Sequence, residues 1–78
     1  MPELTRYAVS GEGVRPYTTK TAAPALAVLP AARALFGRRA RYVITPQLLA
    51  PEGQGYGFQL GAEGRPEVYA LTVFEVSA

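Results

Sequence analysis

Three arginines stand within four consecutive positions near the middle of the chain, at Arg38, Arg39 and Arg41. Each guanidinium is permanently charged and presents five N–H donors, so it binds carboxylate and phosphate groups through paired hydrogen bonds. The spacing therefore predicts a small basic patch that contacts an acidic protein surface or phosphate. A structural interpretation competes with this one, because the negative pole of a helix favours arginines near its last turn.

Three basic residues earlier in the chain bear on the size of this patch. Arg6, Arg15 and Lys20 would extend it if the first hairpin lay beside the third strand. Three arginines are too few for tight sequence-specific binding to DNA. Arginine is enriched among the residues that dominate protein–protein binding energy, so a protein partner is favoured over nucleic acid.

The residue types that most enzymes use are missing from this sequence. Its 78 residues include no His and no Cys, and all six acidic residues are Glu. Without an imidazole, a Ser–His nucleophile cannot form, and the thiolate and imidazole ligands of zinc are absent. The glutamates stand mostly in turns, and the only lysine, Lys20, lies in a threonine-rich stretch. We expect a protein that is not an enzyme, with no catalytic residue, metal or cofactor.

Glycines alternate in the segment "PEGQGYGFQL", but no helix and no Lys-Ser/Thr follows, so a phosphate-binding loop is not predicted. The stretch from Gly55 to Phe58 resembles the centre of the RNA-recognition-motif signature, in which strand aromatics stack on bases. That fold needs a second helix before its last strand, and the chain from Phe58 to Val68 is too short for one. Base stacking on Tyr56 and Phe58 is therefore an alternative function only.

Length and composition predict one compact domain over residues 1–78. The chain is 49% hydrophobic and 18% charged, which is typical of a globular protein. No apolar run approaches the ~20 residues that cross a bilayer, and the first residues lack the features of a signal peptide. We expect a protein of the host bacterial cytoplasm, without membrane contact. Its net charge of +2 favours acidic partners.

The elements that must position these residues follow from the hydrophobic pattern. Alternation predicts strands at 4–10, 14–19, 40–49, 56–60 and 67–76, the second weaker than the others. Pro16 and Pro46 remove ladder donors, so each marks a sheet edge or a strand end. The last strand is apolar on both faces and is therefore central. We predict an α+β fold, with four to five antiparallel strands and one helix on one face, in the order β(β)αβββ.

The run "AAPALAVLPAARALFG" predicts that helix. Thr21 is the expected N-cap, Pro24 lies in the first turn, and Gly37 ends the helix. Pro30 falls in the interior, where it breaks a hydrogen bond, so we expect a kink or two short helices meeting near Leu29.

The faces of this helix can also be assigned from its spacing. The residues expected to face the core are Ala25, Val28, Leu29, Ala32, Leu35 and Phe36. The residues expected on the outer face are Ala23, Ala27, Ala31 and Ala34. Such a small-residue face permits close approach by a second copy of the chain, although alanine is also simply the best helix former.

Taken together, the helix "TAAPALAVLPAARALF" followed by "RYVIT", "GYGFQL" and "VYALTVFEV" resembles the small phage-encoded anti-CRISPR proteins. The chain shares with them small size, a GC-rich phage-like composition and a strand–helix–three-strand order. The resemblance implies a stoichiometric inhibitor that blocks a CRISPR–Cas complex. Many such inhibitors are acidic and mimic DNA, whereas this chain is basic, which favours steric occlusion.

The sequence thus predicts a non-enzymatic binding protein that acts on a protein complex such as a CRISPR–Cas effector. Its expected contact residues are Arg38, Arg39 and Arg41, together with exposed tyrosines such as Tyr17 and Tyr42. Two alternatives are a small module that binds single-stranded nucleic acid and a small structural or regulatory subunit that dimerises.

Overall fold

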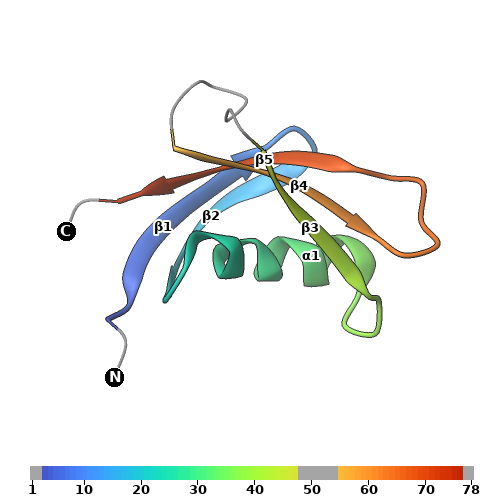
Figure 1. The fold of residues 1–78 in the computed structure, drawn as a ribbon, viewed down its shortest axis with the longest axis horizontal. Helices are drawn as coiled ribbons and strands as arrows, with labels where there is room; N and C mark the ends of the chain where they lie inside the picture. The colour runs from blue at the N-terminus through green and yellow to red at the C-terminus, as the bar shows by residue number, and fades with distance from the viewer. Residues whose placement is uncertain (1–2, 48–54, 77–78) are drawn as a thin grey trace.

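A computed structural model describes residues 3–47 and 55–76 of the chain. Five strands and one two-part helix follow each other in the predicted order (Figure 1). They are β1 (Thr5–Gly11), β2 (Val14–Thr21), the 3₁₀ helix η1 (Pro24–Val28), α1 (Leu29–Phe36), β3 (Tyr42–Gln47), β4 (Tyr56–Ala62) and β5 (Tyr69–Glu75). The last two residues predicted for the third strand, 48–49, lie outside the described residues. So does most of the loop that follows.

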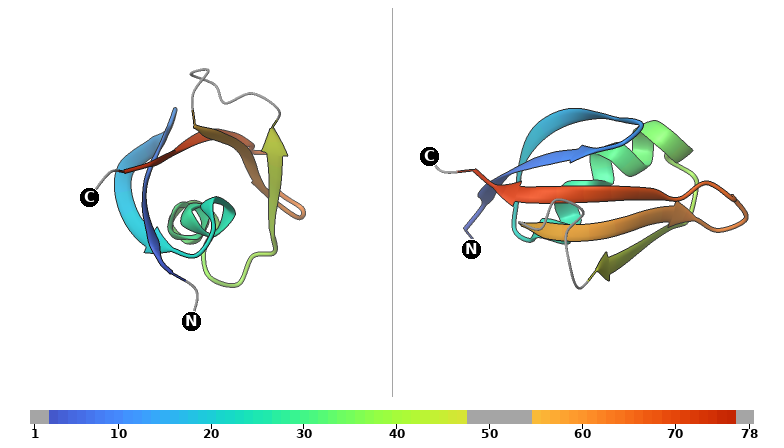
Figure 2. Two further views of the ribbon diagram at one scale, coloured as in Figure 1. Left: turned by 60° about the vertical axis from the view of Figure 1, so that its left-hand side comes forward. Right: turned by 90° about the horizontal axis from the view of Figure 1, so that it is seen from above.

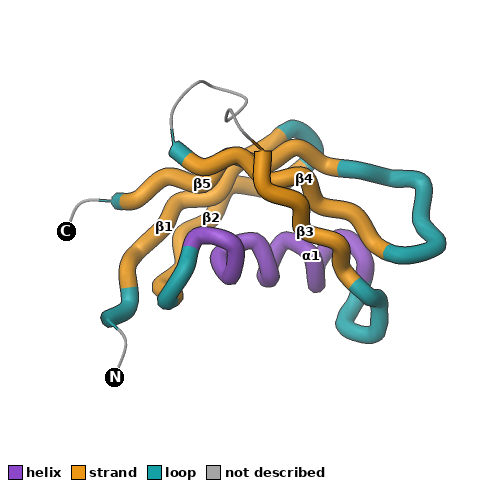
Figure 3. The backbone as a smooth tube through the Cα atoms, in the orientation of Figure 1, coloured by secondary structure: helices purple, strands orange, loops and turns teal. Residues whose placement is uncertain are grey.

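All five strands form one antiparallel sheet in the order β2-β1-β5-β4-β3. The predicted α+β class is confirmed, and so are the meander of the last three strands and the central place of β5. The sheet is curved, and the helix lies against its concave face (Figure 2). Figure 3 shows the resulting two layers, in which the helix of the described residues lies on the concave face only.

Strand alternation sorts the side chains between these two faces. The large side chains that turn toward the helix and are buried are Tyr7, Val9, Phe58, Leu60, Leu71 and Val73. The convex face receives mainly small or uncharged residues, because alternate positions of the strands are Ala, Ser, Thr, Gly and Gln. The hydrophobic core therefore lies entirely between the concave face and the helix.

The helix can approach the sheet closely because its inner face is built from small residues. Ala27, Ala31 and Ala32 are buried there together with Val28 and Phe36. The short helix η1 contacts all five strands, so it occupies the centre of the concave face. A bulkier inner face would hold the helix away and open the core.

This arrangement corrects the predicted faces of the helix. Ala27 and Ala31, expected on the outer face, are 0% and 3% exposed and belong to the core. Ala34 is exposed and Ala23 is half-buried, so a continuous outer alanine stripe for self-association does not form. Thr21 is likewise not an N-cap, since it ends β2 and the helix begins after Ala23 without a side-chain cap.

The predicted break at Pro30 is confirmed, and Tyr17 from β2 explains how it is accommodated. The Tyr17 hydroxyl donates a hydrogen bond to the Ala27 carbonyl oxygen at 2.5 Å and accepts one from the Ala31 N–H at 3.3 Å. In a regular α-helix these two backbone groups would bond to each other. The hydroxyl inserts between them where the 3₁₀ helix gives way to α1, whose first turn tolerates Pro30.

The free edge of β3 carries Pro46, as the sequence predicts. The Glu63 N–H donates to the Arg41 carbonyl at 2.9 Å, so the backbone of Arg41 faces β4. Because bonding direction alternates along an antiparallel pair, the backbone of Pro46 faces the open side. The missing N–H of Pro46 therefore costs the sheet no hydrogen bond and removes a donor from the exposed edge.

The opposite edge, formed by β2, also carries a proline, Pro16. The Val76 N–H donates to the Arg6 carbonyl at 2.9 Å, so Arg6 faces β5 and its neighbours face β2. The backbone groups of Lys20 consequently point away from the sheet, whereas Pro16 lies where the pairing of β1 with β2 shifts register. A proline and a charge on an edge both discourage pairing with another chain, so we expect association through faces of the molecule and not through its edges.

Replacing Tyr17 by Phe tests the hydroxyl bridge between β2 and the helix. We expect Tyr17→Phe to lower the free energy of unfolding by about 1 kcal/mol at neutral pH, measured by urea denaturation. Burial raises the pKa of Tyr17 above its ordinary value of 10.0, so the unfolded chain loses this proton first as pH rises. The stabilisation is therefore complete below pH 10 and is lost as pH rises through the folded-state pKa.

The wild type should accordingly lose more stability above pH 10 than Tyr17→Phe does. Equal losses in the two proteins would show that burial does not raise the pKa of Tyr17. An unchanged free energy of unfolding in Tyr17→Phe at neutral pH would show that the bridge to the helix does not stabilise the fold.

Candidate binding surface

The predicted basic patch lies on the loop that joins α1 to β3. Gly37 ends the helix with φ at 86°, and its N–H donates to the Arg33 carbonyl at 2.9 Å. The Tyr42 hydroxyl donates back to the Gly37 carbonyl and so ties the two ends of the loop together. This closed loop exposes the three arginines Arg38, Arg39 and Arg41. Because the loop is tied at both ends, its backbone holds them in a defined arrangement.

A fourth arginine, Arg65, joins them from the turn between β4 and β5. Its guanidinium lies over the Phe36 ring, 5.6 Å from the ring centre, and this ring in turn packs edge-on against Tyr69. The α1–β3 loop and the β4–β5 turn lie at the same end of the molecule (Figure 1). We call Arg38, Arg39, Arg41 and Arg65 the arginine-rich end.

Two glutamates partly neutralise this end. Arg41 Nε lies 3.8 Å from a Glu63 carboxylate oxygen, with side chains 86% and 64% exposed. Arg65 Nε lies 3.8 Å from Glu67. Pairs this long and this exposed contribute little, so they leave the guanidinium groups open to better partners. Within residues 3–47 and 55–76, Arg38 and Arg39 form no ion pair.

The two tyrosines expected among the contacts are half-buried, and both hydroxyls are already bonded within the chain. Tyr17 holds the helix junction, and Tyr42 closes the arginine loop. Their rings face the core side of the sheet, where both pack against buried residues. Each tyrosine thus has a positioning role, and a direct role in partner contact stays a prediction.

The three basic residues of the first hairpin do not extend the basic patch of the α1–β3 loop. Arg6, Arg15 and Lys20 belong to β1 and β2, and β5 and β4 separate those strands from β3. Arg6 and Lys20 instead stand directly opposite each other, as a second basic pair on the convex face.

The alternative base-stacking surface is also incomplete. Tyr56 is 47% exposed, but Phe58 is only 6% exposed, because it turns inward against the helix. The two aromatics therefore do not form a platform on which successive bases could stack.

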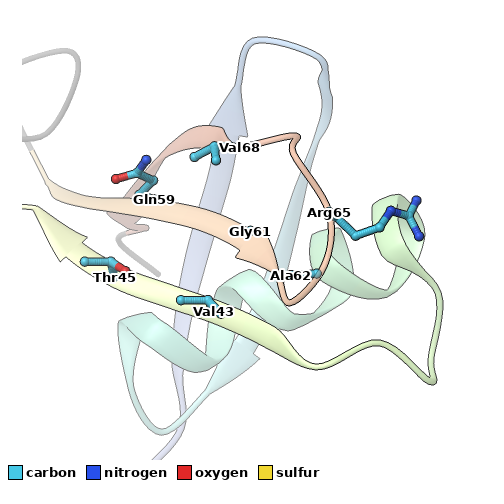
Figure 4. A pocket seen from close by; sticks show the side chains of 7 residues that line it. All are labelled: Val43, Thr45, Gln59, Gly61, Ala62, Arg65 and Val68. Atoms are coloured by element: carbon cyan, nitrogen blue, oxygen red, sulfur yellow. The ribbon is translucent and has the colours of Figure 1, made fainter.

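A shallow groove lies on the convex face beside the arginine-rich end (Figure 4). Its volume is about 250 Å³, and its lining is Val43, Thr45, Gln59, Gly61, Ala62, Arg65 and Val68. Gly61 leaves an open floor along β4, and Val43 and Val68, 49% and 53% exposed, flank it from the neighbouring chain segments. Sequence reasoning missed both the groove and Arg65.

A signal for the groove was present in the alternation of "GYGFQLG". In a strand, this pattern sends Gly57, Gln59 and Gly61 to the face opposite the core.

The described residues contain neither a metal-binding cluster nor a membrane-spanning helix. Among residues 3–47 and 55–76, no group of three His, Cys, Asp or Glu side chains could hold a metal ion. No helix within the same ranges is long and apolar enough to cross a membrane. No family model matches the sequence, and comparisons with curated proteins and with solved structures likewise find no match. Function therefore has to be inferred from the geometry of the surface.

Removing the negative partner of Arg41 tests how loosely that arginine is held. We expect Glu63→Gln to change the free energy of unfolding by less than about 0.5 kcal/mol, measured by urea denaturation. The substitution keeps the shape of the side chain and leaves the backbone bond from Glu63 to Arg41 intact. A loss of several times this size would mean that the ion pair is a structural requirement of the fold.

Proposed function

We propose that this chain is a non-enzymatic binding protein that acts by covering a surface of a larger complex. The observation that carries the proposal is the arginine-rich end, where exposed guanidinium groups stand on a tied loop. Arg38 and Arg39 are exposed without an ion pair among the described residues, and Arg41 and Arg65 make only long, exposed pairs. Carboxylate-rich surfaces offer such groups the paired hydrogen bonds that they lack.

The resemblance to anti-CRISPR proteins gives the proposal a specific target, a bacterial CRISPR–Cas surveillance complex in the host cytoplasm. Steric occlusion agrees with the surface properties of the chain, since its net charge is +2 and four of its seven arginines belong to the arginine-rich end. A DNA mimic would need the opposite charge. The small domain would therefore bind an acidic protein surface of the complex and exclude nucleic acid or a further subunit by its bulk.

Charge reversal at the loop tests this function against a matched control. The variant is Arg38→Glu/Arg39→Glu/Arg41→Glu. The control is Arg6→Glu/Arg15→Glu/Lys20→Glu, which changes the net charge equally but on β1 and β2, at the other side of the sheet. In a panel of purified surveillance complexes, we expect the wild type to bind one complex and to inhibit its cleavage of target nucleic acid. The loop variant should no longer inhibit that cleavage. The loss in affinity should exceed roughly a hundredfold, and the control should retain binding.

Two results would contradict the proposal. The first is that no complex of the panel binds the wild type. The second is an equal loss in both variants, which would indicate attraction by net charge alone. A salt-dependent gel shift with single-stranded DNA or RNA that is lost in the loop variant would favour the nucleic-acid alternative.

A further inference from the structure

The groove on the convex face is of a size that selects its occupant. Pockets for drug-sized ligands and cofactors occupy roughly 300–1,000 Å³ and enclose most of the ligand. This groove holds about 250 Å³ and is open along one side. It is therefore small for a cofactor, but it has room for one or two side chains presented by another polypeptide.

The chemistry of the groove walls further limits which kinds of side chain could bind there. Val43 and Val68 flank the floor at Gly61, and their exposed methyl groups would gain free energy from contact with an apolar side chain. The lining residues Thr45 and Gln59 are polar but uncharged. Among the lining residues there is no aromatic ring on which a nucleobase could stack.

Charge complementarity supplies the second requirement. Arg65 is one of the residues that line the groove, and its side chain points from there toward the helix (Figure 4). Its guanidinium lies over the Phe36 ring. Arg41 leads directly into β3, two residues before Val43, and so projects from the same face of the strand. A carboxylate next to the docked apolar side chain would displace the long pairs with Glu63 and Glu67 at little cost.

We infer that the groove receives an apolar side chain of a partner protein, and that an acidic residue beside it in the partner's sequence binds Arg65 or Arg41. This inference rests on the proposed function, because it makes the groove and the arginine-rich end parts of one contact surface. The apolar side chain fixes the position of the partner, and the carboxylate fixes its direction along β4.

Selection from a random heptapeptide library displayed on phage tests the inference with the whole chain as bait. We expect the selected peptides to share one apolar residue adjacent to Asp or Glu. A synthetic peptide of the selected sequence, carrying a fluorophore, would then be titrated against the protein and followed by fluorescence anisotropy. Changing its acidic residue to Lys should weaken binding roughly tenfold or more.

Three variants alter the groove without disturbing the core. A Cβ at Gly61 would meet the Glu67 carbonyl at 3.7 Å and a Val68 methyl at 3.9 Å, so Gly61→Ala fits and partly fills the floor. Val43→Thr and Val68→Thr keep the shape of the walls and make them polar. Each should weaken the selected peptide about tenfold. Leu26→Gln is the control, because Leu26 is 46% exposed on the helix and lies outside the groove lining.

Several outcomes would overturn the inference. They are a selection without enrichment, selected peptides that lack the acidic residue, and equal binding to the wild type and to the groove variants. A wild-type dimer in light scattering that becomes monomeric with Gly61→Ala would assign the groove to a second copy instead. The peptide selection uses no Cas protein, so it is independent of the proposed target. If no surveillance complex binds the chain but a selected peptide binds in the groove, only the proposed target is refuted.

Discussion

The fold depends on one requirement, that a single helical segment must join the two opposite edges of the sheet. β2 and β3 are consecutive strands in the sequence, yet four strand spacings, about 19 Å, separate them in the sheet. η1 and α1 together measure about 22 Å, enough to make the crossing with short connections. The helix therefore has to lie flat against one face, and the sheet curves around it.

That crossing explains why the inner face of the helix carries small residues and why the junction of η1 with α1 has a fixed position. The segment at the centre of the concave face, η1, contacts every strand, so it tolerates little bulk on its inner side. The Tyr17 bridge and Pro30 together set where 3₁₀ geometry changes to α geometry. Because the hydrophobic core lies on the concave face, the convex face can carry glycine, threonine and alanine without a loss of core packing. The groove at Gly61 is a consequence of that division.

Features set by local chemistry could be predicted from the sequence, and features set by distant pairing could not. Pro16 and Pro46 mark the edges and Pro30 breaks the helix because each effect follows from a missing N–H. The helix faces were partly wrong, since a run of alanines offers little contrast between the inner and outer sides. The role of Arg65 depends on Phe36 lying beneath it, a contact across 29 positions of the chain that no spacing rule provides.

The two interpretations of the arginine loop can now be separated residue by residue. The helix dipole acts within about one turn of the helix end, so Arg38 and Arg39, directly after Gly37, are close enough to interact with it favourably. Arg65 gains from the ring of Phe36. Arg41 gains from neither, because it lies directly before β3, with its side chain 86% exposed and only a long pair to Glu63. The fold gains little from a guanidinium at this position, so Arg41 is the member of the arginine-rich end whose charge depends most on the proposed function for an explanation.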